Sequence, residues 1–272
     1  MSILLSGYYP EGIVFVADKN ATIYYGNAIE NRKYVEPTAT KVLSWPRNNA
    51  VVGFVGLGSL GGLPLDEWMR IFIASTRDFK DINKLATRLK YTLQKDFQRD
   101  YPEGTNISDL QLVIHLGGFT MREGVYVPVM YHIWNHGGID TKTGKYPPGE
   151  RVFRVSEDIK GNFMQWPHPE DYPKMVRNRL QTMINERRYL WFNNGANIGA
   201  FNIFKEFTWQ AIQVIQGAGF LKKYRGILAR VAFCKMAVEV FGAYFTHHHV
   251  PEDRVVGGGV DVAYIPWPKT AA

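Results

Sequence analysis

The feature that most constrains this chain is its opening stretch, which is apolar from the third residue onward. Ile3–Tyr9 and residues 13–17 are rich in β-branched and aromatic side chains, and both patterns predict β-strands. Between them, Pro10 fixes its own φ and Gly12 supplies the unusual backbone angle of a tight turn. We therefore expect the chain to begin inside a sheet, with no leader segment before the first strand.

Ser2 lies directly before the first predicted strand and directly after the initiating methionine. Removal of Met1, which is usual before a small residue, would leave Ser2 with a free α-amino group beside its hydroxyl. Such a pair can act as a nucleophile and as its own general base. The alternative is that the two residues are an ordinary translation start, so the rest of the sequence has to decide between the two interpretations.

The length and composition are those of an ordinary globular protein. The chain has 272 residues, of which 46% are hydrophobic, and this is enough to bury a large core. No apolar run approaches the roughly 20 residues of a membrane span, and no basic stretch with a following apolar one predicts a signal peptide. The single cysteine, Cys234, excludes an internal disulfide framework. We expect a cytoplasmic protein without a membrane partner.

The formal net charge of +7 raises the question of nucleic-acid binding. Lys and Arg are nevertheless spread along the chain with acidic residues among them, as at positions 80–81 and 205–206. The two local basic clusters, at 186–188 and 222–225, are short and suit solvated faces or contacts between subunits. We therefore expect no nucleic-acid partner.

The rest of the chain alternates groups of strands with pairs of helices. After the first pair, strands are predicted at residues 41–45, 50–55, 110–116, 126–134, 151–155, 189–193 and 257–265. Helices are predicted at residues 64–79, 81–99, 198–216 and 224–245, with Asp81 as an N-cap.

Three further segments complete this prediction. Residues 19–40 form a largely polar connection, 135–150 a loop, and 161–187 an inserted segment that contains a helix. The element order predicts an α+β protein, a four-layer αββα sandwich with two sheets face to face and helix pairs outside. We expect one domain over residues 1–272.

The motif Gly56-x-Gly58-x-x-Gly61 follows a predicted strand and precedes a predicted helix, as a dinucleotide-binding fingerprint does. Its context is poor, because the strand belongs to a hairpin series. The acidic residues about 20 positions on, Asp78 and Asp81, lie between two helices instead of after a second parallel strand. Gly56 can instead bring its backbone N–H close to a substrate and stabilise a developing oxyanion.

Other candidate centres give weaker signals. Residues 247–249 are three adjacent histidines at a helix end, so their side chains diverge and do not converge on a metal. A helix C-terminus also suits such residues because it favours positive charge. No Gly-x-Ser-x-Gly turn is present, so a Ser-His-Asp triad is unsupported. Cys234 lies on the apolar face of a predicted helix and is expected in the core. We expect neither a metal nor another cofactor.

Several short segments occur in an order that is typical of one enzyme family. They are Ser2, Gly12–Asp18 with residues 21–22, then residues 40–42, 53–56 and 253–262. Together they resemble proteasome β-type subunits and their bacterial peptidase relatives, which are N-terminal-nucleophile hydrolases. The similarity spans the chain from end to end. The family fold is an αββα sandwich, which is also the fold that the element order predicts.

The resemblance implies roles for five residues. Ser2 is the expected nucleophile, and Asp18 follows it at the family's spacing without a gap. Asp18 would orient Lys41, whose positive charge would favour the alkoxide form of the hydroxyl. The backbone N–H of Gly56 would stabilise the oxyanion, and Asp253 would position the α-amino group of Ser2.

Some residues depart from the family pattern. The nucleophile is serine where the family usually has threonine. Ala196 stands where the family has a mid-chain serine, and Val256 replaces a hydroxyl residue after the late aspartate. Residues 161–187 are foreign to the pattern. Lys33 competes with Lys41, but it lies in a polar run without a following apolar strand, so Lys41 is preferred.

The sequence therefore predicts a peptidase that acts on peptides or unfolded proteins. The resemblance also implies a homo-oligomeric ring, which in this family is often fed by an ATPase. Two alternatives stay open. One is a ring-forming scaffold without turnover, which Ala196 and Val256 favour. The other is a small-molecule amidase of the same superfamily, which would be able to work without a closed ring.

Overall fold

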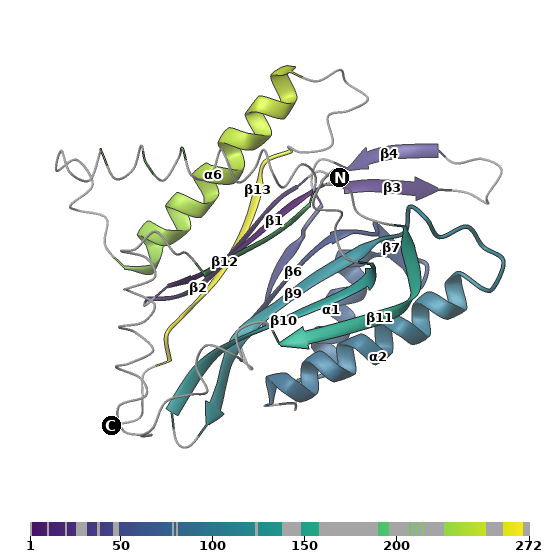
Figure 1. The fold of residues 1–272 in the computed structure, drawn as a ribbon, viewed down its shortest axis with the longest axis horizontal. Helices are drawn as coiled ribbons and strands as arrows, with labels where there is room; N and C mark the ends of the chain where they lie inside the picture. Colours follow the sequence, from purple (N-terminus) through teal and green to yellow (C-terminus); the bar gives the residue numbers. More distant parts are fainter. Residues whose placement is uncertain are drawn as a thin grey trace.

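The computed structural model describes most of the chain. The described residues are 2–9, 11–19, 21–25, 32–36, 39–45, 49–77, 79, 81–122, 125–137, 148–157, 190–195, 207, 210, 214, 226–248 and 258–268. For residues 21–25, 32–36, 122, 125, 190–195 and 244–248 only the backbone is described. These residues form a mixed α/β structure with several antiparallel sheets (Figure 1).

The first sheet has four strands in the order β12–β1–β2–β13. Its strands are β1 (Ile3–Tyr9), β2 (Gly12–Asp18), β12 (Leu190–Gly195) and β13 (Val260–Pro266). The predicted N-terminal hairpin is confirmed, with β1 and β2 paired from Leu4↔Ala17 to Tyr9↔Gly12. β1 also pairs with β12, so the first strand of the chain is an inner strand of its sheet.

The second sheet has five strands in the order β11–β10–β9–β6–β5. Its strands are β5 (Val42–Trp45), β6 (Ala50–Gly56), β9 (Leu112–Arg122), β10 (Val125–His136) and β11 (Gly149–Glu157). The predicted strands are confirmed, and the last three extend beyond the predicted ranges. Neighbouring strands in this sheet pair antiparallel.

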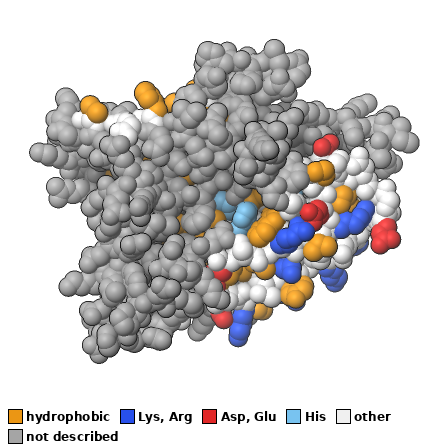
Figure 2. Space-filling view, in the orientation of Figure 1, with side chains coloured by type: hydrophobic (Ala, Val, Ile, Leu, Met, Phe, Trp, Pro, Cys, Tyr) orange, Lys and Arg blue, Asp and Glu red, His pale blue; other side chains and the backbone are white. Residues whose placement is uncertain are grey.

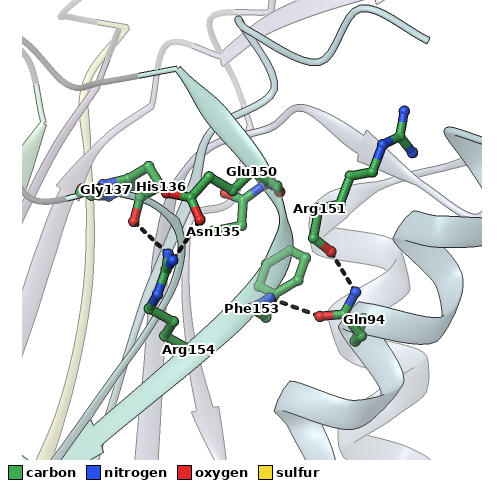
Figure 3. Close-up of polar contacts among 8 residues, drawn as sticks. All are labelled: Gln94, Asn135, His136, Gly137, Glu150, Arg151, Phe153 and Arg154. Atoms are coloured by element: carbon green, nitrogen blue, oxygen red, sulfur yellow. Dashed lines mark hydrogen bonds and ion pairs between the residues drawn. The ribbon is translucent and has the colours of Figure 1, made fainter. Parts of the chain in front are cut away.

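The outer strand β11 is held by the Gln94 side chain of α2 and by its own Arg154, which contacts the backbone of β10 (Figure 3). The amide of Gln94 accepts from the Phe153 N–H at 2.7 Å and donates to the Arg151 carbonyl, so it pairs with β11 as another strand would. On the other side, Arg154 donates to the His136 carbonyl at 3.0 Å and pairs with Glu150 at 2.5 Å. These contacts stabilise the edge where the β10–β11 register shifts.

The long described helices are α1 (Leu65–Ser75), α2 (Ile82–Asp100) and α6 (Ile227–His248). Asp81 caps α2 as predicted, because its carboxylate accepts from the Asn83 N–H at 2.9 Å. The prediction that the first helix continues to residue 79 is wrong. The hydroxyls of Ser75 and Thr76 donate to the Phe72 carbonyl, and such bonds compete with the helical ladder at this end.

The structure differs from the prediction between residues 19 and 40. There β3 (Ala21–Tyr25) and β4 (Arg32–Glu36) form an antiparallel hairpin that extends away from the two sheets (Figure 1). The polar composition of the segment predicted a connection, but the β-branched and aromatic residues of β3 favour a strand. The short strands β7 (Ser59–Leu60) and β8 (Leu63–Pro64) form another small hairpin.

That second hairpin accounts for part of the glycine motif. Gly61 and Gly62 lie in its turn with φ of 66° and 74°, values that suit glycine at the two central positions. Gly61 therefore serves a β-turn between two paired strands, and the segment after β6 does not pass directly into a helix.

Three apolar clusters connect these elements. Ile3, Leu5 and Tyr9 of β1 pack with α6, whereas Leu4 and Tyr8 of the same strand pack against the second sheet. This alternation is what a strand buried on both faces requires. On its other face, the second sheet packs against α1 and α2.

The predicted helix at 198–216 lies mostly outside the described residues, and the segment at 161–187 lies entirely outside them. The complete four-layer sandwich therefore stays a prediction. Within the described residues, no helix is both long and apolar enough to span a membrane. Figure 2 shows acidic and basic side chains interspersed over the described part of one face.

Candidate active site

The candidate site lies where the start of β1 meets the end of β2. Ser2 directly precedes β1 and is buried, with 7% of its surface exposed. The Ile3 N–H donates to Asp18 Oδ1 at 2.7 Å, and Asp18 is the last residue of β2. The hairpin register brings these two ends together, because Leu4 pairs with Ala17 one position further along. The short N-terminal hairpin thus places Ser2 beside a buried carboxylate.

Lys41 reaches this pair from the second sheet, where it directly precedes β5. Its Nζ donates to Ser2 Oγ at 2.7 Å and to Asp18 Oδ1 at 3.2 Å. The Lys41 and Asp18 side chains are only 5% and 1% exposed, so this ion pair is shielded from water. The structure therefore brings together three of the residues that the sequence singled out.

The environment of Lys41 weakens its hold on the proton. Burial lowers its pKa from the ordinary value, and the neighbouring Asp18 carboxylate and, more weakly, Asp261 offset only part of that effect. A lysine ammonium with a lowered pKa shares its proton more readily with a hydrogen-bonded hydroxyl than an exposed lysine does. The Ser2 hydroxyl is thus in contact with a group that can exchange protons.

Asp261 is a residue of this neighbourhood that sequence reasoning missed. It lies in β13, where Oδ2 accepts from the Lys41 backbone N–H at 2.6 Å and Oδ1 pairs with Lys19 Nζ at 3.3 Å. The available signal was an acidic residue between Val260 and Val262 in an otherwise apolar strand. Because the contact joins residues 220 positions apart, their distance in the sequence gives no indication of it.

Gly56 ends β6 with φ of 110°, a value that side chains rarely permit. A Cβ at this position would lie 2.0 Å from the Gln111 carbonyl oxygen, so only glycine fits. That same carbonyl accepts from the Leu57 N–H at 2.8 Å. The Phe54 N–H donates to the Lys41 carbonyl at 3.0 Å, which places the end of β6 beside the lysine segment.

The other residues that the sequence singled out fall wholly or partly outside the part of the chain that the structure describes. Asp253, Ala196 and Val256 lie outside the described residues. Lys33 lies in β4, where only the backbone is described, and residues 247–249 lie beyond the described side chains of α6.

The structure describes two residues, Gly258 and Gly259, of the glycine segment that precedes β13. Gly258 and Gly259 have φ of 71° and 94°, and the Gly259 carbonyl accepts from the Lys19 N–H at 3.1 Å. This bond ties the entry to β13 to the residue that follows β2, so the segment borders the site.

Cys234 is confirmed as a core residue. It is fully buried in α6, where its thiol and the Tyr9 hydroxyl form a hydrogen bond of 3.0 Å. Burial raises the pKa of the thiol to about 12, which makes it a poor nucleophile at neutral pH. Within the described part of the chain, no group of three or more His, Cys, Asp or Glu side chains is placed to bind a metal ion.

Ser6 and His115 form a second hydroxyl pair that sequence reasoning missed. Ser6 Oγ lies 2.7 Å from His115 Nδ1, between the two sheets, and both residues are fully buried. Four residues of extended strand separate Ser6 from Ser2, about 13 Å. Burial and the neighbouring His132 hold the pKa of His115 well below its usual value. We interpret this pair as part of the core.

Comparison with known proteins gives little beyond a general likeness. No family model matches the chain, and no curated protein matches it. Among solved structures, the chain is similar to Anbu (ancestral beta-subunit) from Yersinia bercovieri, with a TM-score of 0.45 and 12% sequence identity. The match covers 97% of this chain and 81% of that one. A likeness at this level assigns neither family nor activity, so the function has to come from the residues of the site.

Proposed function

We propose that this chain is an N-terminal-nucleophile hydrolase that cleaves amide bonds with Ser2 after removal of Met1. The observation that carries the proposal is the buried contact of 2.7 Å from Lys41 Nζ to Ser2 Oγ, with Asp18 behind the lysine. A lysine on a solvated face, or an aspartate that only caps a turn, would not be buried against a serine hydroxyl. These features support a nucleophile with its activating groups.

In the proposed reaction, the free α-amino group of Ser2 takes the proton from Oγ, directly or through a water molecule. Its reference pKa is about 7.7–8.0, so it is partly neutral at physiological pH. Oγ then attacks the substrate carbonyl carbon, and the carbonyl π electrons move to oxygen. The Gly56 N–H stabilises this oxyanion, and one such donor commonly contributes about 2.7–4 kcal/mol.

Collapse of the tetrahedral intermediate breaks the carbon–nitrogen bond and leaves an acyl ester on Ser2. The leaving amine takes the proton held by the α-ammonium group. Water then attacks the ester with the α-amino group as general base, which releases the acid and restores Ser2. The two half-reactions together consume one water molecule for each amide bond.

Lys41 and the two aspartates have supporting roles in this proposal. The Lys41 ammonium stabilises the developing alkoxide through its hydrogen bond to Oγ, and its positive charge keeps the nearby α-amino group neutral. Asp18 orients Lys41. Asp253, which lies outside the described residues, is proposed on the sequence resemblance to position the α-amino group.

The substrate and assembly rest on the sequence resemblance. We propose peptides or unfolded proteins as substrates, a single αββα domain over residues 1–272, and a homo-oligomeric ring with an ATPase as a possible partner. The rival proposals are a scaffold without turnover and a small-molecule amidase. Reactivity of Ser2 distinguishes the first of these from an enzyme.

The decisive experiment is intact-mass analysis with peptide mapping, before and after incubation with a β-lactone that acylates N-terminal nucleophiles. We expect loss of Met1 and a single adduct on Ser2. Lys41→Ala should slow labelling at least about 100-fold, the lower range for the loss of one donor that stabilises a developing negative charge. Lys33→Ala is the matched control and should label like the wild type.

Two results would contradict the proposal. Retained Met1, or a free Ser2 that never labels, would favour the scaffold. Full labelling of the Lys41→Ala variant would remove that lysine from the mechanism. Circular dichroism of each variant confirms that the comparison concerns folded protein.

A further inference from the structure

Lys41 is held at two points by carboxylates from two different strands. Asp18 of β2 contacts its ammonium group at 3.2 Å, and Asp261 of β13 accepts from its backbone N–H at 2.6 Å. β13 belongs to the first sheet, whereas Lys41 directly precedes β5 of the second sheet. The Asp261 side chain therefore joins the two sheets beside the candidate site.

Asp261 is itself held in place. Its second carboxylate oxygen pairs with Lys19 Nζ at 3.3 Å, so both oxygens have partners. The Asp261 side chain is 12% exposed, and that of Lys19 is 33% exposed. In the pairing of β13 with β2, Asp261 lies opposite Ala17 and Val260 lies opposite Asp18. The two carboxylates that hold Lys41 thus come from adjacent register positions of paired strands.

We infer that Asp261 is a positioning residue of the proposed hydrolase, which fixes the Lys41 backbone and favours its ammonium form through its own negative charge. This inference rests on the proposed function, because its consequence is expressed in the reactivity of Ser2. Asp261 acts through Lys41, with no contact to the reacting atoms required. Lys19 restrains the second oxygen of the carboxylate.

The charges around Lys41 determine in which direction its pKa should change when Asp261 is replaced. Among the described residues, the groups that face it include Ser2 before β1, Asp18 at the end of β2 and Asp261 on β13, with Lys19 behind Asp261. Asp18 and Asp261 both raise the pKa of Lys41 against the larger effect of burial. Loss of the Asp261 charge must therefore lower that pKa further, and Lys41 would lose its proton at a lower pH.

The test is the pH profile of Ser2 acylation by the β-lactone, and of amide hydrolysis, for Asp261→Asn in the full-length processed protein. Asparagine keeps an oxygen acceptor for the Lys41 N–H but has no charge. We expect the alkaline limb of the profile to move down by on the order of one pH unit, as for the loss of one nearby opposite charge. The Lys41 segment should stay in place.

Two further variants separate charge from anchoring. Asp261→Ala also removes the acceptor, so kcat should fall roughly 10- to 100-fold with little change in KM, as for a displaced catalytic group. Lys19→Gln is the matched control, because it removes a charge of opposite sign that is one-third exposed. The alkaline limb of the pH profile of this variant should stay in place or move to a slightly higher pH.

The outcomes separate this inference from the proposed function. A wild-type Ser2 that never reacts would overturn both. If the wild type reacts and both Asp261 variants keep its alkaline limb and kcat, only the positioning role is wrong. A lower Tm of the Asp261 variants, with no shift in the alkaline limb of their pH profiles, would show that Asp261 has only a structural role. A Lys19→Gln profile that moves down like that of Asp261→Asn would also overturn the inference.

Discussion

Lys41 combines burial with a charge, which lysine side chains rarely do. Removing an ammonium group from water costs several kcal/mol, and one ion pair repays this only when its geometry is good. Here the ammonium group has the Asp18 carboxylate and the Ser2 hydroxyl as partners. Burial nevertheless lowers the pKa of Lys41 more than its partners raise it, so the charged form costs stability, as charged groups at functional sites commonly do.

The position of Gly56 leads to a testable prediction about a single residue. In Gly56→Ala the new Cβ would lie 2.0 Å from the Gln111 carbonyl oxygen, whereas a Cβ added at Gly104, which has φ of 91°, would meet no atom within 4 Å. Both substitutions incur the backbone cost of a positive φ, about 1–2 kcal/mol. Gly56→Ala should lower the free energy of unfolding by about 1–3 kcal/mol more, because of the clash.

Urea denaturation of the two variants and the wild type measures this difference. Gly104→Ala is the matched control, since it shares the backbone angle and lacks the clash. Equal losses in the two variants would contradict the interpretation of Gly56 as a position without space for a side chain.

The family resemblance singled out Ser2, Asp18 and Lys41 in the sequence, and the contact between the first two depends on a local element. Ser2 and Asp18 are joined by one tight hairpin, so their spacing places them together once two strands are recognised. Lys41 precedes a readily recognised apolar strand. Asp261 could not be predicted in this way, because its role depends on how two sheets pack across 220 positions of sequence.

At the scale of elements, β1 and β9 meet through the buried pair of Ser6 and His115. The pKa of His115 is well below its usual value in the folded protein and returns to about 6.5 on unfolding. Below about pH 6.5 the unfolded chain therefore binds a proton that the folded chain does not. Stability should fall as the pH decreases, by up to about 1.4 kcal/mol per pH unit.

Urea titrations between about pH 7 and about pH 5 test this, the window set by the ordinary pKa of histidine. His115→Gln keeps a polar side chain without a titrating group, so its stability should depend less on pH. Ser6→Ala is the control, because it loses a hydrogen bond worth about 1 kcal/mol but keeps the histidine. A pH dependence unchanged in His115→Gln would assign it to other groups.

Elements with one dominant pattern were predictable, and those with competing patterns were not. α2 has a regular apolar face and a capping aspartate, and both were visible in the sequence. The β3–β4 hairpin was missed because its strand residues are embedded in a polar segment. The end of α1 was misplaced, since apolar spacing continues to Phe79 while the hydroxyls of Ser75 and Thr76 end the helix earlier.

At the scale of the molecule, the described surface carries charges of both signs. Figure 2 shows them interspersed over one face. Ion pairs also form between described side chains, as between Arg99 and Asp96 at 3.0 Å. The net charge of +7 is therefore not gathered into one basic surface over the part of that face that the structure describes. This arrangement gives no support to nucleic-acid binding.

The molecule should also assemble with its own copies. The sequence resemblance predicts a homo-oligomer, and Leu228, Met236 and Val240 of α6 are exposed apolar side chains whose burial between copies would stabilise one. Light scattering with size-exclusion chromatography should give the same oligomer mass at two protein concentrations, a whole-number multiple of the monomer mass that is greater than one. A fully active monomer would contradict the ring and favour the amidase.

The position of β1 between β2 and β12 has a consequence for how the segment that carries Ser2 can move. Most chain termini fray at almost no cost in free energy, independently of the rest of the fold. Here the first strand is bonded on both edges, to residues 12–17 and 190–195. Displacement of the strand that follows Ser2 therefore requires breaking its pairing with both β2 and β12. The geometry around the proposed nucleophile should therefore last as long as this pairing does.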